Sequence, residues 1–199
     1  MEYWIRTLND RIFDYSNPQK SNVDLIDMAN ALSHVNRFGG HTKTPYSVGQ
    51  HSLFIHSLVS NSKHSDDIYL KKLALVHDFH EAYFGDMTSP LKWYLKDKFG
   101  FDANAYCDEI DTVIFDVLKM RKPLAEEKKL LKYYDTLALA IEQRFLQDVD
   151  PTSKIAPFLS FTEKDIVEIM RFKESDFNKF LLLQPGTVAI QIVSLVSRY

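Results

Sequence analysis

The sequence has few of the residues that mark specialised protein classes. Its 199 residues include one cysteine, Cys107, which excludes an internal disulfide framework and suits a reducing compartment. No apolar run reaches the roughly 18 residues of a membrane helix, and the start, MEYWIRTLNDR, lacks a continuous signal-peptide core. The net charge of −3 gives no bulk basic surface for nucleic acid or membranes. We therefore expect a cytoplasmic protein (the host's cytoplasm if phage-encoded) without membrane or nucleic-acid partners.

The remaining composition is that of an ordinary globular protein. Hydrophobic residues make up 45% and charged residues 26% of the chain, enough for a substantial core. The length suits one domain, and no repeat or low-complexity tract divides it. Strand signals are sparse, so the predicted class is all-α. We expect a single domain over 1–199, with a core at about 22–148 and a C-terminal helical extension and tail over 160–199.

The apolar period and capping signals predict the individual helices. Ser47 and Gln50 have capping-box spacing, and Pro123 suits a first helical turn. Helices are expected over 22–36, from about 47, over about 66–84, over 103–120, and from KPLAEE to about Gln147. A short amphipathic piece, LKWYLKDKF, follows the third, and one or two helices are expected in TEKDIVEIMRFKESDFNKFLLL. The first 20 residues suit a short extended segment, whereas the tail PGTVAIQIVSLVSRY suits a strand, a packed helix or a subunit contact.

The stretch LVHDFHEAYFGDMTSPL places titratable side chains on a helix that otherwise has the pattern of a buried one. A histidine on an apolar face is more often a satisfied core residue than a ligand, and for His80 we favour that interpretation. For His77, the adjacent Asp78 and the nearby Glu81 favour metal binding instead. A buried carboxylate usually becomes protonated or finds a cation. A shared metal ion would satisfy His77 and Asp78 together.

Two residues elsewhere in the chain extend this pattern. Asp135 interrupts the apolar face of LLKYYDTLALAIEQRF, where an aspartate is a poor helix former and a poor core residue. An ion pair with a nearby lysine or arginine is the ordinary alternative, and a metal ligand from a second helix is the functional one. His51 is a weak signal alone. The combined set is two imidazoles, of His51 and His77, and two carboxylates, of Asp78 and Asp135. This set suits one divalent ion such as Co, Mn, Zn, Mg or Fe.

The order H … HD … D, with HDFHEAYFGDMTSPLK around the pair, resembles the HD-domain phosphohydrolase superfamily. The chain is most similar to its small nucleotidase-like branch, which includes bacterial 5′-deoxynucleotidases and phage dATP triphosphohydrolases. ALSHVNRFGGHTKTPYSVGQHS and YYDTLALAIE also carry the resemblance, which spans residues 31 to 142. It implies a helical bundle with one metal ion between core helices, and a homo-oligomer, for which the apolar tail is a plausible contact.

The resemblance also implies roles for single residues. It gives the metal-ligand positions to His51, His77, Asp78 and Asp135. Glu81 matches the catalytic acid/base position, and Asp86 matches an acidic residue in the loop that follows. Arg37 matches a phosphate-binding arginine, and Pro90 lies in the loop that closes the nucleoside pocket. Phe38 stands where relatives commonly have tryptophan near the nucleoside, which leaves base and sugar recognition open.

Physical chemistry supports the main roles independently. A divalent ion polarises a phosphoryl oxygen and lowers the pKa of water. Glu81 lies one helical turn past the ligand pair, where it can move a proton. A planar guanidinium binds phosphate oxygens bidentately, which favours Arg37. His41, Lys43 and Lys92 lie in the flanking loops and are candidate phosphate contacts. The alternative for these three, and for Lys96, is solvated surface.

Other functions built on a similar helical core fit less well. Di-iron oxygenases need further histidines before the last aspartate, yet His80 is the last histidine in the chain. Cyclic-dinucleotide phosphodiesterases carry a Gly-Tyr-Pro signature that is absent here. A non-catalytic nucleotide-binding module predicts a broken ligand set or a missing Glu81. We favour a dATP-type triphosphohydrolase, because basic residues surround the ligands, and keep a 5′-deoxynucleotidase acting on monophosphates as the alternative.

Overall fold

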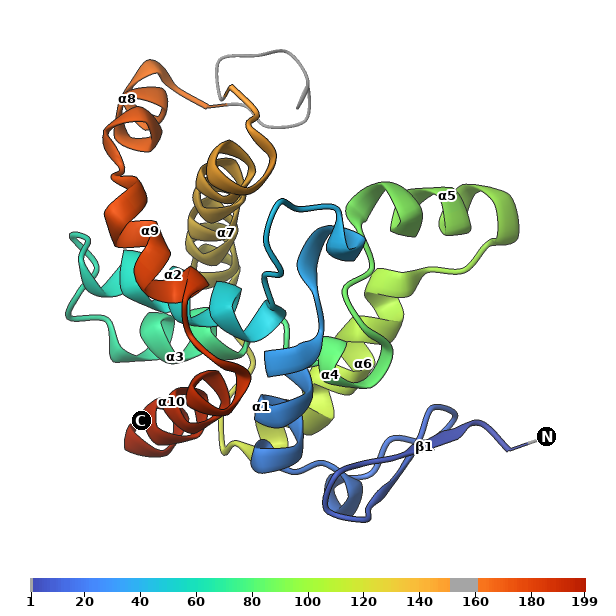
Figure 1. The fold of residues 1–199 in the computed structure, drawn as a ribbon. Coiled ribbons are helices and arrows are strands. Elements are labelled where there is room, and N and C mark those ends of the chain that lie inside the picture. The colour runs from blue at the N-terminus through green and yellow to red at the C-terminus, as the bar shows by residue number, and fades with distance from the viewer. Residues whose placement is uncertain (1, 151–160) are drawn as a thin grey trace.

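The computed structural model describes residues 2–150 and 161–199, and within them the protein is almost entirely helical (Figure 1). An antiparallel hairpin of β1 (Trp4–Arg6) and β2 (Ile12–Asp14) and the 3₁₀ turn η1 (Lys20–Asn22) come first. The helices then follow as α1 (Leu25–His34), η2 (Arg37–Gly40, a 3₁₀ turn), α2 (Val48–Ser60), α3 (Ile68–Val76), α4 (Glu81–Phe84), α5 (Ser89–Phe99), α6 (Ala103–Val117), α7 (Ala125–Gln147), α8 (Glu163–Arg171), α9 (Glu174–Leu181) and α10 (Pro185–Arg198). The predicted helical class and N-terminal extended segment are confirmed.

Helix α2 joins the two halves of the core. Its Val48 and Leu53 pack in a cluster with α1, α3, α6 and α10, while Phe54 and Ile55 pack in a second cluster with α3, α7, α8 and α9. The helix begins at Ser47, whose hydroxyl accepts from the backbone N–H of Gln50 while the Gln50 side chain accepts from Ser47 N, so the predicted capping box is present. Polar side chains on α2 are therefore held in the middle of the molecule.

The ambiguous tail is a helix packed into the core. Val188, Ile192 and Val196 of α10 are buried, and α10 lies along α1 (Figure 1). Gly49 allows this close approach, because a Cβ at that position would lie 2.7 Å from Val188 Cγ1 and 3.2 Å from Leu32 O. Of the alternatives for the tail, the structure shows the packed helix and not the strand, and a subunit contact in a homo-oligomer stays a prediction.

Two predicted helix boundaries were wrong. The expected helix over 66–84 is broken, because α3 ends at Val76 and α4 begins at Glu81. Between them the backbone forms 3₁₀-type hydrogen bonds between residues three apart, from Phe79 N–H to Val76 O and from Glu81 N–H to Asp78 O. Pro123 lies just before the N-cap of α7 and not in its first turn. The break falls on the His-Asp pair, so it sets the directions of both side chains.

No single helix in the described residues is long and apolar enough to cross a membrane. The pair α9 and α10, which is bent by 95°, passes the same test of length and composition when both helices are taken together.

Candidate metal centre

Two buried imidazoles meet near the middle of the fold. His51, fully buried on α2, directs Nδ1 at Glu142 Oε1, 2.6 Å away, and its Nε2 lies 3.5 Å from Asp78 Oδ2 and 3.4 Å from Asp135 Oδ1. His77 follows α3; its Nδ1 bonds to the carbonyl of Ala74 at 2.9 Å, and its Nε2 lies 3.0 Å from Asp78 Oδ2. Ligand atoms of His51, His77 and Asp78 lie within 4.8 Å of one another, and Asp135 adjoins this group through its contact with His51. The four predicted ligands thus come from three segments of the chain.

The hydrogen bonds of the two imidazoles suit metal ligation. A carbonyl or carboxylate only accepts, so Nδ1 of His51 and of His77 must carry the proton of each bond. Both Nε2 atoms are buried and have no hydrogen-bond partner within residues 2–150 and 161–199. Metal-bound histidines commonly show this arrangement, in which an outer acceptor fixes the ring and leaves the other nitrogen for the ion. The donor set of two imidazoles and two carboxylates thus fits a divalent cation.

The charges around the cluster also favour a bound cation. Burial and Arg37 oppose protonation of His51, but Glu142 and Asp135 outweigh them and raise its pKa to about 9. Burial alone would raise the pKa of Asp78, yet the imidazoles of His77 and His51 hold it well below the ordinary value. The acidic groups thus favour a positive charge at this point, and a divalent ion would replace the proton on His51.

Asp135 satisfies both interpretations that the sequence left open. Its Oδ1 lies near His51, and its Oδ2 accepts from Lys132 Nζ at 2.9 Å, one turn earlier on α7. Burial would raise the pKa of Asp135, but its bond with His51 keeps it well below the ordinary value. The aspartate is therefore both an ion-pair partner and a member of the cluster.

Glu142 is a central residue that the sequence analysis missed. It is fully buried, and its Oε1 accepts from His51 and, at 3.1 Å, from the Tyr46 hydroxyl, while its Oε2 lies 3.2 Å from an Arg37 guanidinium nitrogen. Arg37 also lies 3.7 Å from Asp78 Oδ2. The signal was present, because Glu142 lies seven residues, or two turns, after Asp135 on the same face of α7.

Glu81 and Asp86 lie beside the cluster. Glu81 is buried, and its Oε2 has no hydrogen-bond partner in the described part of the chain. Burial raises the pKa of the Glu81 carboxyl well above its ordinary value, and the carboxylates of Asp78 and Asp86 raise it further. Asp86 accepts from the backbone N–H of Phe38 at 2.9 Å and so holds Phe38 at a φ of 58°. His80 donates to Asp111, which supports its expected structural role.

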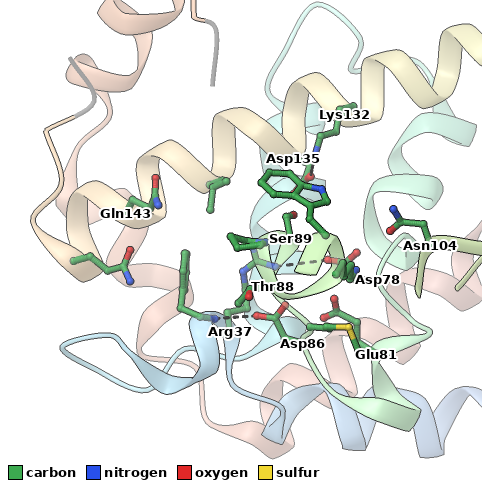
Figure 2. Close-up of a pocket in the computed structure, with 17 residues that line it drawn as sticks. Arg37, Asp78, Glu81, Asp86, Thr88, Ser89, Asn104, Lys132, Asp135 and Gln143 are labelled. Atoms are coloured by element: carbon green, nitrogen blue, oxygen red, sulfur yellow. Dashed lines mark hydrogen bonds and ion pairs between the residues drawn. The ribbon is translucent and has the colours of Figure 1, made fainter. Parts of the chain in front are cut away.

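A cavity of about 510 Å³ opens onto this cluster (Figure 2). In Figure 2, α7 carries Lys132, Asp135 and Gln143 along one wall, and Asp78 lies below it. Predicted site residues in the lining are Arg37, Phe38, Asp78, Glu81, Asp86, Pro90, Lys92 and Asp135. Residues that the sequence analysis did not assign also line it, among them Thr88, Ser89, Trp93, Asn104, Lys132, Leu139 and Gln143.

Two predicted phosphate contacts lie elsewhere. His41 and Lys43 border a separate, shallow hollow near the end of α7, and Lys43 forms an ion pair with Asp148. Lys96, for which surface was the alternative, forms an ion pair with Asp102. The main cavity therefore keeps Arg37, Lys92 and Lys132 as its basic side chains.

Comparison with known proteins places the chain among bacterial relatives. It is 32% identical over 143 residues to YfdR of Escherichia coli, described as an uncharacterized protein, and the match covers 72% of each chain. The chain belongs to the YfdR family. An uncharacterized protein of Rhodobacter capsulatus is 33% identical over 91 residues, covering 45% of this chain and 46% of the relative. No model of a known protein family matches the chain. Membership of the YfdR family does not itself indicate a reaction.

Proposed function

We propose that the protein is a metal-dependent phosphohydrolase of the HD-domain type that cleaves the 5′-phosphoester of deoxynucleotides. The observation that carries this proposal is the pair of unsatisfied, buried Nε2 atoms of His51 and His77 beside Asp78. Leaving such atoms unpaired in a protein interior is costly unless a ligand satisfies them. A single divalent ion on His51, His77, Asp78 and Asp135 would do so and would supply a Lewis acid for a phosphoryl oxygen.

The chain's own residues supply the remaining chemistry. Hydrolysis forms a bond between water oxygen and phosphorus, breaks the bond from phosphorus to O5′, and delivers a proton to O5′. Burial raises the pKa of the Glu81 carboxyl, which favours its protonated form, so it is suited to donate the proton to O5′ and to recover one from the attacking water. Arg37 is held in place by Glu142 and lines the cavity, where its fixed positive charge can stabilise the transferring phosphoryl group.

The cavity lining supports a nucleoside as the group attached to the phosphate. The aromatic rings of Phe38 and Trp93 and the ring of Pro90 provide flat apolar surfaces for a base and a sugar. The amides of Asn104 and Gln143 provide donors and acceptors for base edges or the sugar hydroxyl. Phe38 lines the cavity and is fixed in place by Asp86, and we propose that its ring excludes a 2′-hydroxyl and so selects deoxyribose.

We favour a triphosphohydrolase, which releases the deoxynucleoside and intact triphosphate in the cytoplasm, because Lys92 and Lys132 line the cavity with Arg37 and add positive charge for a longer phosphate chain. His41 and Lys43 lie outside this cavity and do not support the preference. A 5′-deoxynucleotidase that acts on deoxynucleoside monophosphates is the second candidate, since Arg37 and the metal alone suffice for one phosphate. A non-catalytic nucleotide-binding module is a weaker third, because the buried Glu81 carboxyl beside the ligands has no evident structural partner among the described residues.

A product assay separates these candidates. The protein is stripped with chelator, reloaded singly with Co, Mn, Zn, Mg or Fe, and offered dATP, dGTP, dAMP and dGMP. Deoxynucleoside plus intact triphosphate is the expected result. Free phosphate from monophosphates alone establishes the nucleotidase instead. Binding of a nucleotide without turnover under any metal contradicts the proposal and favours the binding module.

A further inference from the structure

A second cavity, of about 490 Å³, adjoins the metal-ligand cluster at a different point. It shares Lys132 and Asp135 with the first cavity, but it reaches His77 where the first reaches Asp78. Both cavities therefore border the same cluster of predicted ligands. The other lining residues come from α3, α6, α7 and the segment before α7; they are Leu73, Asp108, Asp111, Thr112, Phe115, Lys122, Pro123, Lys128 and Leu131.

The lining of this second cavity holds three lysines and three aspartates, and two of the lysines have no ion-pair partner among the described residues. Lys122 and Lys128 form no ion pair with any residue in 2–150 or 161–199, and both are exposed at the rim. Lys132 reaches toward the centre by its bond to Asp135. Among the acidic residues in the lining, Asp111 is already paired with His80. With Asp135 bound to an ion and Asp111 paired with His80, the lining would carry three lysines and one remaining acid, Asp108, and this excess of positive charge suits an anion.

The two cavities suit different parts of one ligand. The first is lined by the rings of Phe38 and Trp93 and by two amides, which suit a nucleoside, whereas the second is lined by one aromatic ring, Phe115, and by no amide side chain of the described residues. Its volume is within the range of small-molecule sites. We infer that the second cavity binds the polyphosphate chain of a nucleoside triphosphate, with Lys122 and Lys128 contacting the phosphates beyond the one at the metal centre. This inference rests on the proposed function and names its substrate class.

The exposed positions of Lys122 and Lys128 determine how much their replacement should weaken triphosphate binding. Contacts between exposed charges contribute modestly and are screened by salt. Removing both should therefore weaken triphosphate binding by about tenfold at low ionic strength, and by less at high salt. Binding of orthophosphate or of a monophosphate should not change, because neither reaches the rim.

The test compares Lys122→Gln/Lys128→Gln with the matched control Lys63→Gln/Lys129→Gln. The control removes the same charge from exposed lysines that line neither of these two cavities. Calorimetry measures binding of inorganic triphosphate and of orthophosphate to the Mn-loaded full-length protein, with equal free Mn in cell and syringe. The KM values for dATP and dAMP are measured on the same preparations.

Weaker binding of triphosphate in the cavity variant alone, with orthophosphate unchanged, is the expected result. The same loss without turnover of any deoxynucleotide would support the anion site while contradicting the proposed function. Triphosphate affinity equal in the wild type and the cavity variant would overturn the inference, and so would equal losses for triphosphate and orthophosphate. If dATP were still hydrolysed in that case, the proposed function would stand without the second cavity.

Discussion

Glu142 is the best position at which to test how the buried charges organise the centre. Glu142→Gln keeps the side-chain shape and removes the negative charge that holds His51 Nδ1 and Arg37. Removing one partner of a buried ion pair costs about 3–5 kcal/mol. For a chain of this length each kcal/mol lowers Tm by about 2–4 °C, so a decrease of about 6–20 °C is expected. Loss of an outer partner should also weaken metal affinity by about 10–100-fold.

The assay separates a positioning role from a purely structural one. Thermal unfolding gives the stability change, and metal affinity is then measured by calorimetry at a temperature where both proteins are folded. Tyr46→Phe is the matched control, because it removes the third partner of Glu142 and leaves the charge in place; it should cost about 0.5–1.5 kcal/mol and leave metal affinity unchanged. Glu142→Gln with wild-type metal affinity would refute the reasoning.

Three further predictions concern catalysis, ligation and packing. Glu81→Gln should retain the metal and lower turnover about 10²–10⁴-fold; undiminished turnover would remove Glu81 from the mechanism. Uptake of a divalent ion at pH 7 should release about one proton, because the pKa of His51 is about 9 without the ion; calorimetric heats that are the same in buffers of different ionisation enthalpy would contradict this. Gly49→Ala should destabilise the protein by about 1–3 kcal/mol, since its methyl group meets Val188 and Leu32; an unchanged Tm would show that α10 shifts freely.

Local signals in the sequence were sufficient for most of the helices. The Ser47 capping box and the apolar period located α2 and α7 because these features act within a few residues of the chain. The break between α3 and α4 was not predictable in this way. The apolar period continues through it, and only the cluster of polar groups around His77 indicated that the backbone was under other constraints.

The candidate site likewise contains residues that the sequence predicted and residues that it could not predict. His77, Asp78 and Asp135 were chosen because their chemistry is unusual for helical core positions. His51 was a weak signal alone and took its position from the resemblance to HD-domain phosphohydrolases, and the fold places it beside Asp78 and Asp135. The role of Glu142 depends on contacts with residues 91 or more positions away, which no local pattern contains. The positions of His41 and Lys43 outside the main cavity follow from the path of the loop, which residue type does not determine.

The central claim is that these four residues hold one catalytic ion, and metal content per chain tests it most directly. Wild-type protein and His77→Ala are stripped, exposed singly to the five divalent ions, dialysed and analysed for bound metal, with deoxynucleotide hydrolysis measured on the same samples. One ion per chain in the wild type, none in the variant, and hydrolysis only where the ion is retained is the predicted result. Equal metal content in the two proteins, or no bound metal in the wild type, would contradict the account.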